Sequence, residues 1–305
     1  MAQAPDWLSE LPLKPGPPWL SMGVRPLDLD EWLVVDDDFA AQLELKARLL
    51  AERHDEVFAA RPGTEAAGAE LLERIQAWLT THVPTEGSAP AAEPVPSRGD
   101  IGRPDGTGSP APAPGALLHP LDRAGRLVQE DLCLLAPEDG RHVLVAASLC
   151  FPSHWRLADK MGLPVAAIHG PVPHYAPELE ARVDTFFERL RPGRPVVRRN
   201  LSIHAHDDLF RPEPHESPDS FAPDLSGLDQ VWLRSERQTL LRLDGTGTVV
   251  FTIKTQQCPV GVLAQRPDVA SALAAKLRAL EPELVASGET VPFPSWLIGW
   301  LLDPR

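Results

Sequence analysis

One histidine stands in an unusually stiff stretch of the sequence. His169 lies in residues 164–174, PVAAIHGPVPH, and is followed closely by Pro171 and Pro173. Proline fixes its own φ at about −65° and restricts the residue before it, so the backbone after His169 has few accessible conformations. A side chain held in one direction suits an axial metal ligand, but a turn that leads into a helix needs the same stiffness. His174 is the alternative ligand in this stretch.

A second group of polar residues follows a strand-like pattern. His204 and His206 share one face of a predicted strand with Asn200 and Ser202, because side chains alternate between the two faces of a strand. A two-histidine metal site is conceivable, since acidic residues come directly afterwards. No third ligand is obvious, and the pattern favours a solvated face. His154, earlier in the chain, could face a pocket, although a surface position is expected for it. The acidic residues are Asp207 and Asp208.

Composition excludes several classes of function. The 305 residues carry a net charge of −14, which argues against binding nucleic acid, because such binding depends on clustered lysine and arginine. Cys133, Cys150 and Cys258 are too widely spaced for a CxxC motif and too few for a disulfide framework, so a reducing cytoplasm is the expected location. No stretch reaches the roughly 20 apolar residues that span a bilayer, so no membrane association is expected.

The chain divides at one sharp change in composition. Residues 84–115 contain eight prolines and six glycines, which predicts a disordered insertion. Residues 1–83 are expected to form an N-terminal extension and helical layer, because leucines recur at helical spacing in residues 38–82 around a break at Pro62 and Gly63. Residues 116–285 are expected to form the core and residues 286–305 a C-terminal segment.

The core shows an alternation of strand and helix patterns. Strands are predicted at residues 127–135, 142–150, 196–205, 231–243 and 248–255. Short broken helices and one longer helix, residues 177–190, lie between the second and third strands. This is the element order of the PAS sensor fold. The sequence therefore predicts an α+β protein in which a PAS-like antiparallel sheet is flanked by helices.

Several motifs together resemble one known family. In chain order, they are MGVRPLDLDEWL, QEDLCLL, LCFPSHWRLADKMGLPVAAIHGPVP, VVRRNLSIH, VWLRSERQTLLRL and VVFTIKT. In order and spacing they are similar to the haem-dependent oxidative N-demethylase-like family, over about residues 22–280. The resemblance implies a PAS-like domain that holds haem b, activates dioxygen and oxidises a methyl group of a small secondary amine such as dimethylamine, releasing formaldehyde. It also implies that a separate flavin and iron–sulfur reductase supplies the electrons.

The resemblance assigns a role to the stiff histidine. In haem-binding PAS domains the ligand is a histidine near the long helix, so His169 becomes the preferred axial ligand, within the frame of Pro171 and Pro173. Cys150 is an alternative ligand, but an apolar setting raises the pKa of a thiol and opposes it. Where the family usually shows Asn-Trp, this chain has Asn200 and Leu201, and Leu201 is expected to replace a core side chain.

Arg237 is expected to bind a haem propionate. It shares its strand face with apolar side chains, and a buried guanidinium needs an anion. Gln238 and Thr239 are its expected polar neighbours, and Asn200 completes the expected cofactor-binding residues. The alternative is a structural ion pair of Arg237 with Glu236 or Asp159.

A cationic amine needs a carboxylate or an aromatic face, for which Glu236, Trp155 and Trp232 are available. Two other functions stay open. One is a haem-based sensor, and the other is a scaffold of the same fold without haem.

Overall fold

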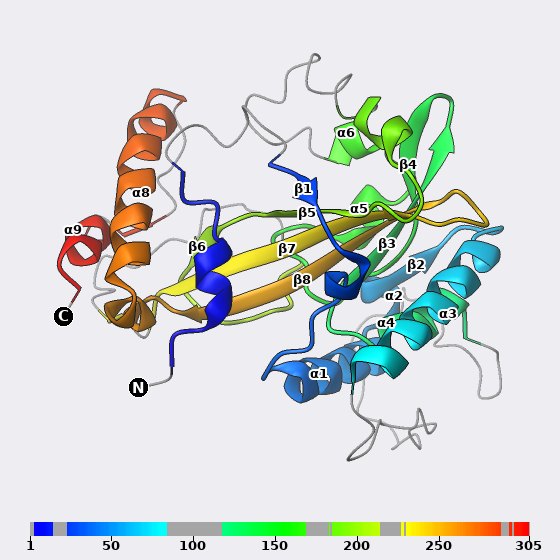
Figure 1. The fold of residues 1–305 in the computed structure, drawn as a ribbon, viewed down its shortest axis with the longest axis horizontal. Helices are drawn as coiled ribbons and strands as arrows, with labels where there is room; N and C mark the ends of the chain where they lie inside the picture. Colours follow the sequence, from blue (N-terminus) through cyan, green and yellow to red (C-terminus); the bar gives the residue numbers. More distant parts are fainter. Residues whose placement is uncertain are drawn as a thin grey trace, which may run out of the picture.

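The computed structural model describes residues 3–14, 23–83, 118–168, 183, 185–213, 227–228, 230–287, 293–294 and 296–304 (Figure 1). Mixed helices and an open antiparallel sheet in this part of the chain confirm the predicted α+β class. The predicted insertion, residues 84–115, lies outside the described residues. So do His169, Pro171, Pro173 and His174. No helix within the described ranges has both the length and the apolar character to cross a membrane.

The first 83 residues form helices and also strands. The predicted helical layer is confirmed by α1 and α3, which are separated at Pro62 and Gly63, where Gly63 has a positive φ of 89°. The sequence did not indicate the short strands β1 and β2. The elements of this part are 3-10 helix η1 (Asp6–Glu10), β1 (Arg25–Pro26), 3-10 helix η3 (Leu29–Glu31), α1 (Phe39–Glu52), α2 (His54–Val57), β2 (Phe58–Ala60) and α3 (Glu65–His82).

The core follows the predicted order of two strands, short helices and further strands. Residue 183 and residues 185–189 are helical, within the longer helix that the sequence predicts. The elements are α4 (Pro120–Gly125), β3 (Asp131–Glu138), β4 (Arg141–Ser148), α5 (Leu157–Lys160), α6 (Val165–Ile168), β5 (Val196–Arg199), β6 (Ser202–His204), β7 (Trp232–Arg242), β8 (Val249–Pro259), 3-10 helix η4 (Val260–Gln265), α8 (Pro267–Ser287) and α9 (Leu297–Leu302).

One sheet joins the N-terminal part to the core. Its strand order is β1-β5-β7-β8-β3-β4-β2, and β6 pairs with β7 beyond the end of β5. The short strands β1 and β2 lie outside β5 and β4, so the first 60 residues occupy both edges of the sheet. Edge strands of only two and three residues offer little backbone for pairing with another chain.

Two strand predictions need correction. The first strand begins at Asp131 rather than at residue 127, because Gln129 and Glu130 bind the N-terminal segment instead of the ladder. Glu130 Oε1 accepts from the Val34 amide at 2.9 Å, and Gln129 Nε2 donates to Asp36 Oδ1 at 2.8 Å. The strand predicted at residues 196–205 is divided into β5 and β6. At the break, Asn200 Oδ1 accepts from the Glu236 amide at 2.7 Å, so a side chain replaces the ladder carbonyl.

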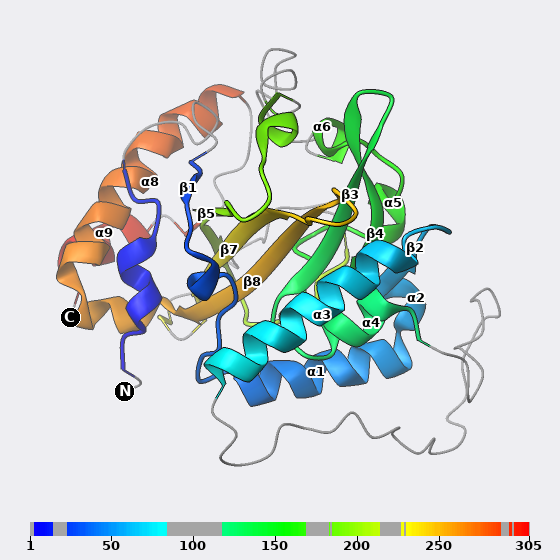
Figure 2. The same cartoon turned by 45° about the vertical axis from the view of Figure 1, so that its right-hand side comes forward.

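The two faces of the sheet have different covers (Figures 1 and 2). We call them the α3 face and the α6 face. On the α3 face, Leu241 and Val250 pack with side chains of α3 and α4. On the α6 face, Leu240 and Ile253 pack with side chains from α5, α6 and the segment around residue 187. The α3-face cluster includes Leu71, Leu72, Ile75, Leu121, Leu132, Leu134, Val143 and Val145. The α6-face cluster includes Cys133, Leu135, Leu144, Leu157, Val165, Val183, Phe187 and Leu190.

A third apolar cluster lies at the end of the sheet where β6 and β7 meet α8 and α9 (Figure 1). Trp7 and Leu8 of η1 pack there with Leu273 of α8 and Leu301 of α9. The amide of Ala4 also donates to Gln265 Oε1 at 3.1 Å. The two ends of the described chain therefore pack against each other.

Candidate active site

The strand β7 separates the predicted site residues into two groups. Side chains at alternate positions point to opposite faces, so Arg237 and Thr239 lie on the α3 face, whereas Glu236 and Gln238 lie on the α6 face. Asn200 joins the second group, because its side chain contacts Glu236. The sheet lies between the two groups. The expectation that Gln238 and Thr239 both neighbour the Arg237 guanidinium is therefore wrong for Gln238.

Arg237 is held by the N-terminal segment. Its Nη1 donates to the Trp32 carbonyl at 3.0 Å and its Nη2 donates to the Glu31 carbonyl. Burial lowers the pKa of Arg237, and nearby Glu130 opposes this shift. These contacts differ from the ion pair with Glu236 or Asp159 that the sequence suggested. Thr239 is also engaged, because its hydroxyl lies 2.6 Å from the hydroxyl of Thr252 in β8.

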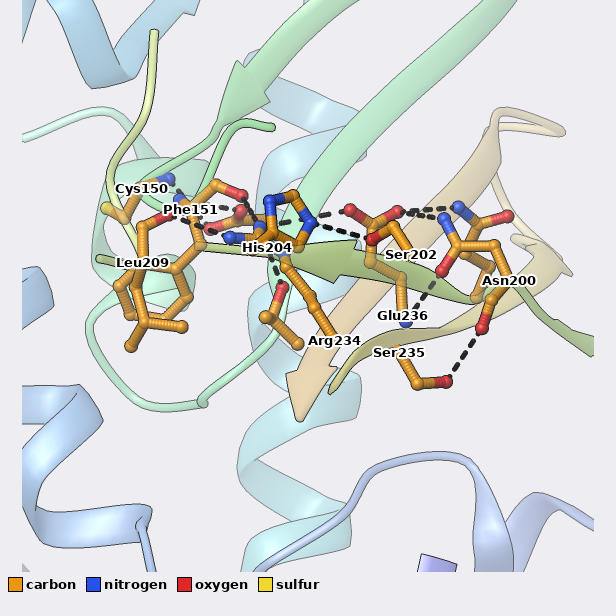
Figure 3. A network of polar contacts seen from close by, with 12 residues as sticks. Cys150, Phe151, Asn200, Ser202, His204, Leu209, Arg234, Ser235 and Glu236 are labelled. Carbon is orange, nitrogen blue, oxygen red and sulfur yellow. Dashed lines mark hydrogen bonds and ion pairs between the residues drawn. The ribbon is translucent and has the colours of Figure 1, made fainter. Parts of the chain in front are cut away.

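A reciprocal pair of polar residues, Asn200 and Glu236, lies on the α6 face where β5 gives way to β6 (Figure 3). The Asn200 amide donates to the Glu236 carbonyl at 3.1 Å, and Asn200 Nδ2 donates to Glu236 Oε2 at 2.8 Å. Gln238 Nε2 donates to the same carboxylate oxygen at 2.9 Å. Ser235 Oγ donates to the Asn200 carbonyl at 2.8 Å. Glu236 is therefore fixed in one orientation by neutral amide donors to its Oε2.

Two arginines accompany this carboxylate. Arg234 Nη2 lies 3.8 Å from Glu236 Oε1 and donates to the Phe151 carbonyl at 2.8 Å, which ties the loop after β4 to the sheet. Arg198 lies opposite Gln238 across the β5–β7 pairing. Its Nε is buried and has no hydrogen-bond partner among the described residues. Burial lowers the pKa of both guanidinium groups, against the attraction of Glu236.

Three histidines gather beside the pair. The imidazole of His204 points toward the carboxylate of Glu236 (Figure 3), and its Nε2 lies 2.7 Å from Ser202 Oγ. The His154 ring stacks on it, with centroids 5.9 Å apart and planes 7° apart. The solvated face expected from the sequence is wrong for His204, which is only 5% exposed, whereas 31% of the His206 side chain is exposed. His154 is half-buried rather than on the surface, because its ring covers His204.

The backbone of His154 is unusual. Its φ is +63°, a region that only a few per cent of non-glycine residues adopt, mostly in tight turns. The His154 amide donates to the Arg211 carbonyl at 2.8 Å, and the Arg211 amide donates to the Pro152 carbonyl at 3.2 Å. These two bonds hold the turn that places the ring over His204. Such conformations concentrate at functional sites.

The remaining predicted side chains lie at the border of this site. Trp155 is half-buried and packs on the α6-face cluster, and Trp232 lies opposite His204 in the β6–β7 pairing. Leu201 packs with the cluster that contains Ile203, as a core replacement would. Cys150 is buried, and burial raises the pKa of its thiol to about 12, which opposes thiolate ligation as expected.

The described residues on both sides of the predicted ligand lie on the same face. Val165 and Ile168 of α6 pack on the α6-face cluster, and so do Val183 and Phe187. The described chain is therefore on this face directly before residue 169 and again at residue 183. His169 itself lies outside the described residues, and its role as ligand stays a prediction. Within the described part of the chain, no group of three or more His, Cys, Asp or Glu side chains could hold a metal ion.

The α3 face contains a buried charged network that the sequence did not indicate. Lys46 is fully buried, and its Nζ donates to the carbonyls of Val128, at 2.9 Å, and of Glu130. Lys254 is also fully buried and lies 3.0 Å from Asp36 Oδ2. Burial lowers the pKa of Lys254, against the attraction of Asp36. This network fastens α1 and the segment before it to the sheet.

The structure adds Arg198 and Arg234 to the site, and it buries His204, which was expected on a solvated face, beside them. Arg198 could have been found from the alternation of side chains that groups Asn200, Ser202 and His204 on one strand face, because it stands two residues before Asn200. For Arg234, the signal is the polar side of the strand pattern in residues 231–243. Polar residues at alternate positions on a covered face indicate a binding surface more directly than one arginine among apolar residues.

The fold and this patch define a class of protein. An antiparallel sheet carries half-buried and buried polar side chains on one face next to an apolar surface, a combination that suits ligand binding. The family comparison then identifies the chain. A family model described as "Haem-dependent oxidative N-demethylase, alpha subunit-like" matches residues 23–287, and the chain belongs to this family. The resemblance found in the sequence motifs is thereby confirmed. The description as an alpha subunit indicates one component of a multi-component oxygenase.

The residues of the α6 face fit a haem group. Haem needs an apolar surface and cations for its two carboxylates. Apolar side chains of Leu240, Phe251 and Ile253 lie next to the polar patch. Arg198 presents a guanidinium whose Nε has no partner among the described residues, which fits a carboxylate of the cofactor. On the α3 face, by contrast, the Arg237 guanidinium already has two carbonyl partners.

Proposed function

We propose that the chain is the haem-binding component of an oxidative N-demethylase that acts on a small secondary amine such as dimethylamine. Dimethylamine, dioxygen, two electrons and two protons give methylamine, formaldehyde and water. The proposal is supported by the family match and by one structural observation. A carboxylate fixed by Asn200 and Gln238 lies on the same covered face as the Arg198 guanidinium. When bound, haem b supplies the activation of dioxygen.

The cofactor is held by residues of the α6 face. His169, within the frame of Pro171 and Pro173, would ligate the haem iron, and Arg198 would bind one propionate in place of Arg237. Support for His169 comes from its neighbours, because α6 ends at Ile168 on this face. The order of the core elements supports a PAS-like arrangement of the domain. The unusual turn at His154 closes the edge of the site.

The substrate is oriented by Glu236. A secondary amine is a cation at neutral pH, and a fixed, partly desolvated carboxylate binds it more strongly than a mobile one on the surface. Asn200 and Gln238 both donate to Glu236 Oε2, whereas Oε1 accepts no hydrogen bond from them and has Arg234 Nη2 at 3.8 Å, so the ammonium group would bind at Oε1 beside this guanidinium. Trp155 offers an aromatic face at the border of the site. His204 points toward the same carboxylate and can exchange protons there (Figure 3).

A partner supplies the electrons. The sequence has no glycine-rich dinucleotide loop after a strand, and three scattered cysteines cannot ligate an iron–sulfur cluster. In the structure all three cysteines are buried and free, which also suits the cytoplasm. We therefore assign the electrons to a separate flavin and iron–sulfur reductase.

Formaldehyde release tests the proposal. Purified haem-loaded protein receives a reduced flavin and iron–sulfur donor, dioxygen and a panel of small secondary and tertiary methylamines. At least one amine shifts the Soret band and yields formaldehyde, and omission of dioxygen or of the donor abolishes the product. If no amine shifts the spectrum and no formaldehyde forms, while carbon monoxide binds tightly and reversibly, the protein is a sensor.

A further inference from the structure

A cleft of about 260 Å³ opens on the surface where the helical residues 185–189 lead into β5. Three arginines surround it, and three apolar side chains complete its lining. The lining residues are Phe186, Arg189, Leu190, Arg191, Arg194 and Val196. We call this feature the arginine cleft.

The charges of the arginine cleft are unusual for this chain. Arg189, Arg191 and Arg194 are exposed, and none of their guanidinium groups has an acidic partner in the part of the chain that the structure describes. Arginines elsewhere do have such partners: the exposed Arg53 pairs with Glu56 and Arg61 with Glu138, and the half-buried Arg74 pairs with Asp244 and Arg266 with Asp268. A local positive surface thus stands on a chain of net charge −14.

The arginine cleft is firmly attached to the sheet. Arg242 of β7 donates to the carbonyls of Phe187 at 2.7 Å and of Leu190 at 2.8 Å. Its third contact is the Gly247 carbonyl at 2.6 Å, in the turn between β7 and β8. Leu190 and Phe187 are buried in the α6-face cluster. The three arginines therefore extend from a fixed base, and binding there requires little ordering of the backbone.

The arginine cleft lies close to the candidate active site. Val196 lines the cleft and begins β5, and Asn200 follows four residues later on the same side of the chain. A strand rises about 3.3 Å per residue, so the separation is roughly 13 Å. Arg198 lies between them on the same face. A donor that binds at the cleft would therefore stand near the cofactor without entering the site.

We infer that the arginine cleft is the docking surface for an acidic face of the subunit that donates electrons. The inference rests on the proposed function. Charge complementarity supports it, because three exposed arginines without an acidic partner among the described residues attract an acidic surface. The composition agrees as well. Arginine and aromatic residues are enriched at the centres of protein interfaces, and Phe186 lies among the arginines.

Charge reversal tests the inference. An acidic plant-type [2Fe–2S] ferredoxin serves as the probe, and calorimetry measures its binding to the full-length protein at low and at physiological ionic strength. The combined substitution Arg189→Glu, Arg191→Glu and Arg194→Glu should weaken binding by roughly tenfold or more and remove most of its salt dependence. The matched control, Arg48→Glu, Arg123→Glu and Arg278→Glu, has the same net charge and should bind as the wild type does. These control arginines are also exposed.

Two further measurements separate the possible failures. Dithionite should reduce the haem of all three proteins equally, so that a loss confined to ferredoxin identifies docking. If the purified protein cannot be loaded with haem, the proposed function is overturned. Calorimetry still measures ferredoxin binding with or without haem, so it tests the docking surface separately. Equal binding by the two triple variants overturns the docking surface. So does binding of inorganic phosphate at the cleft without any binding of ferredoxin, because the cleft would then be a small-anion site.

Discussion

Exchanging each of two arginines for methionine distinguishes the two faces of the sheet. Methionine keeps the apolar part of the side chain and removes the charge. Arg198→Met breaks no hydrogen bond of Nε within the described chain, and it removes the cost of burying a positive charge. In Arg237→Met, the buried carbonyls of Glu31 and Trp32 lose their donors. The first change should affect haem binding and the second should affect folding.

The magnitudes follow from the contacts. A hydrogen bond between a guanidinium and a carboxylate contributes about 1.5–3 kcal/mol, so Arg198→Met should weaken haem binding roughly 10- to 150-fold. The Tm of its haem-free form should change by less than about 2 °C. In Arg237→Met, two buried carbonyls lose charged donors, so the free energy of unfolding should fall by about 3 kcal/mol or more. This loss corresponds to a Tm that is lower by roughly 6 °C. Its haem affinity should stay within about threefold of the wild-type value.

Haem transfer to an acceptor protein measures the first effect, and thermal unfolding followed by circular dichroism measures the second. Arg198→Lys is the conservative control, because it keeps a cation and should recover part of the affinity. The assignment of Arg198 is refuted if Arg198→Met retains haem as the wild type does while folded Arg237→Met loses it. Arg237 would then bind the propionate, as the sequence suggested.

Two more outcomes follow from the same contacts. Glu236→Gln should raise the KM for the amine roughly 10- to 100-fold, because a partly desolvated ion pair is lost, while the Soret band of the resting protein stays unchanged; an unchanged KM places the amine elsewhere. Burial raises the pKa of Asp122, but hydrogen bonds from His54 and Arg126 outweigh burial and bring the pKa below 3.8. Asp122 therefore stabilises the fold above about pH 4. This stability is lost as the pH falls through the lower pKa that Asp122 has in the folded protein. Asp122→Asn should remove that part of the pH dependence in urea unfolding, and an unaltered acid limb of the stability profile contradicts this account.

Local chemistry made most of the core predictable. Asp139 and Gly140, with φ values of 49° and 78°, form the turn between β3 and β4, and an Asp-Gly pair favours such a turn by itself. The alternation in residues 231–243 correctly placed Arg237 with the buried side chains of β7. Both features depend on neighbouring residues, and so they are visible in one sequence.

Long-range contacts explain the predictions that failed. The strands β1 and β2 are two and three residues long and exist because β5 and β4 offer them edges. The buried Lys46 looks like a surface residue of an amphipathic helix, and its burial depends on the carbonyls of Val128 and Glu130 and on the buried carboxylate of Asp131, 4.0 Å away. Arg237 was assigned to the cofactor for a related reason. Its burial was predicted correctly, but its partners are main-chain carbonyls about 200 positions away, which no local pattern reveals.

The absorption spectrum of haem-reconstituted variants tests the central assignment most directly, namely that haem binds on the α6 face through His169. The account predicts a Soret band for the wild type, its loss or severe weakening in His169→Ala, and its retention in both His174→Ala and the half-buried control His206→Ala. A wild-type ferric and ferrous spectrum in His169→Ala would contradict the assignment, and loss of the band in His174→Ala alone would transfer the role of ligand to His174.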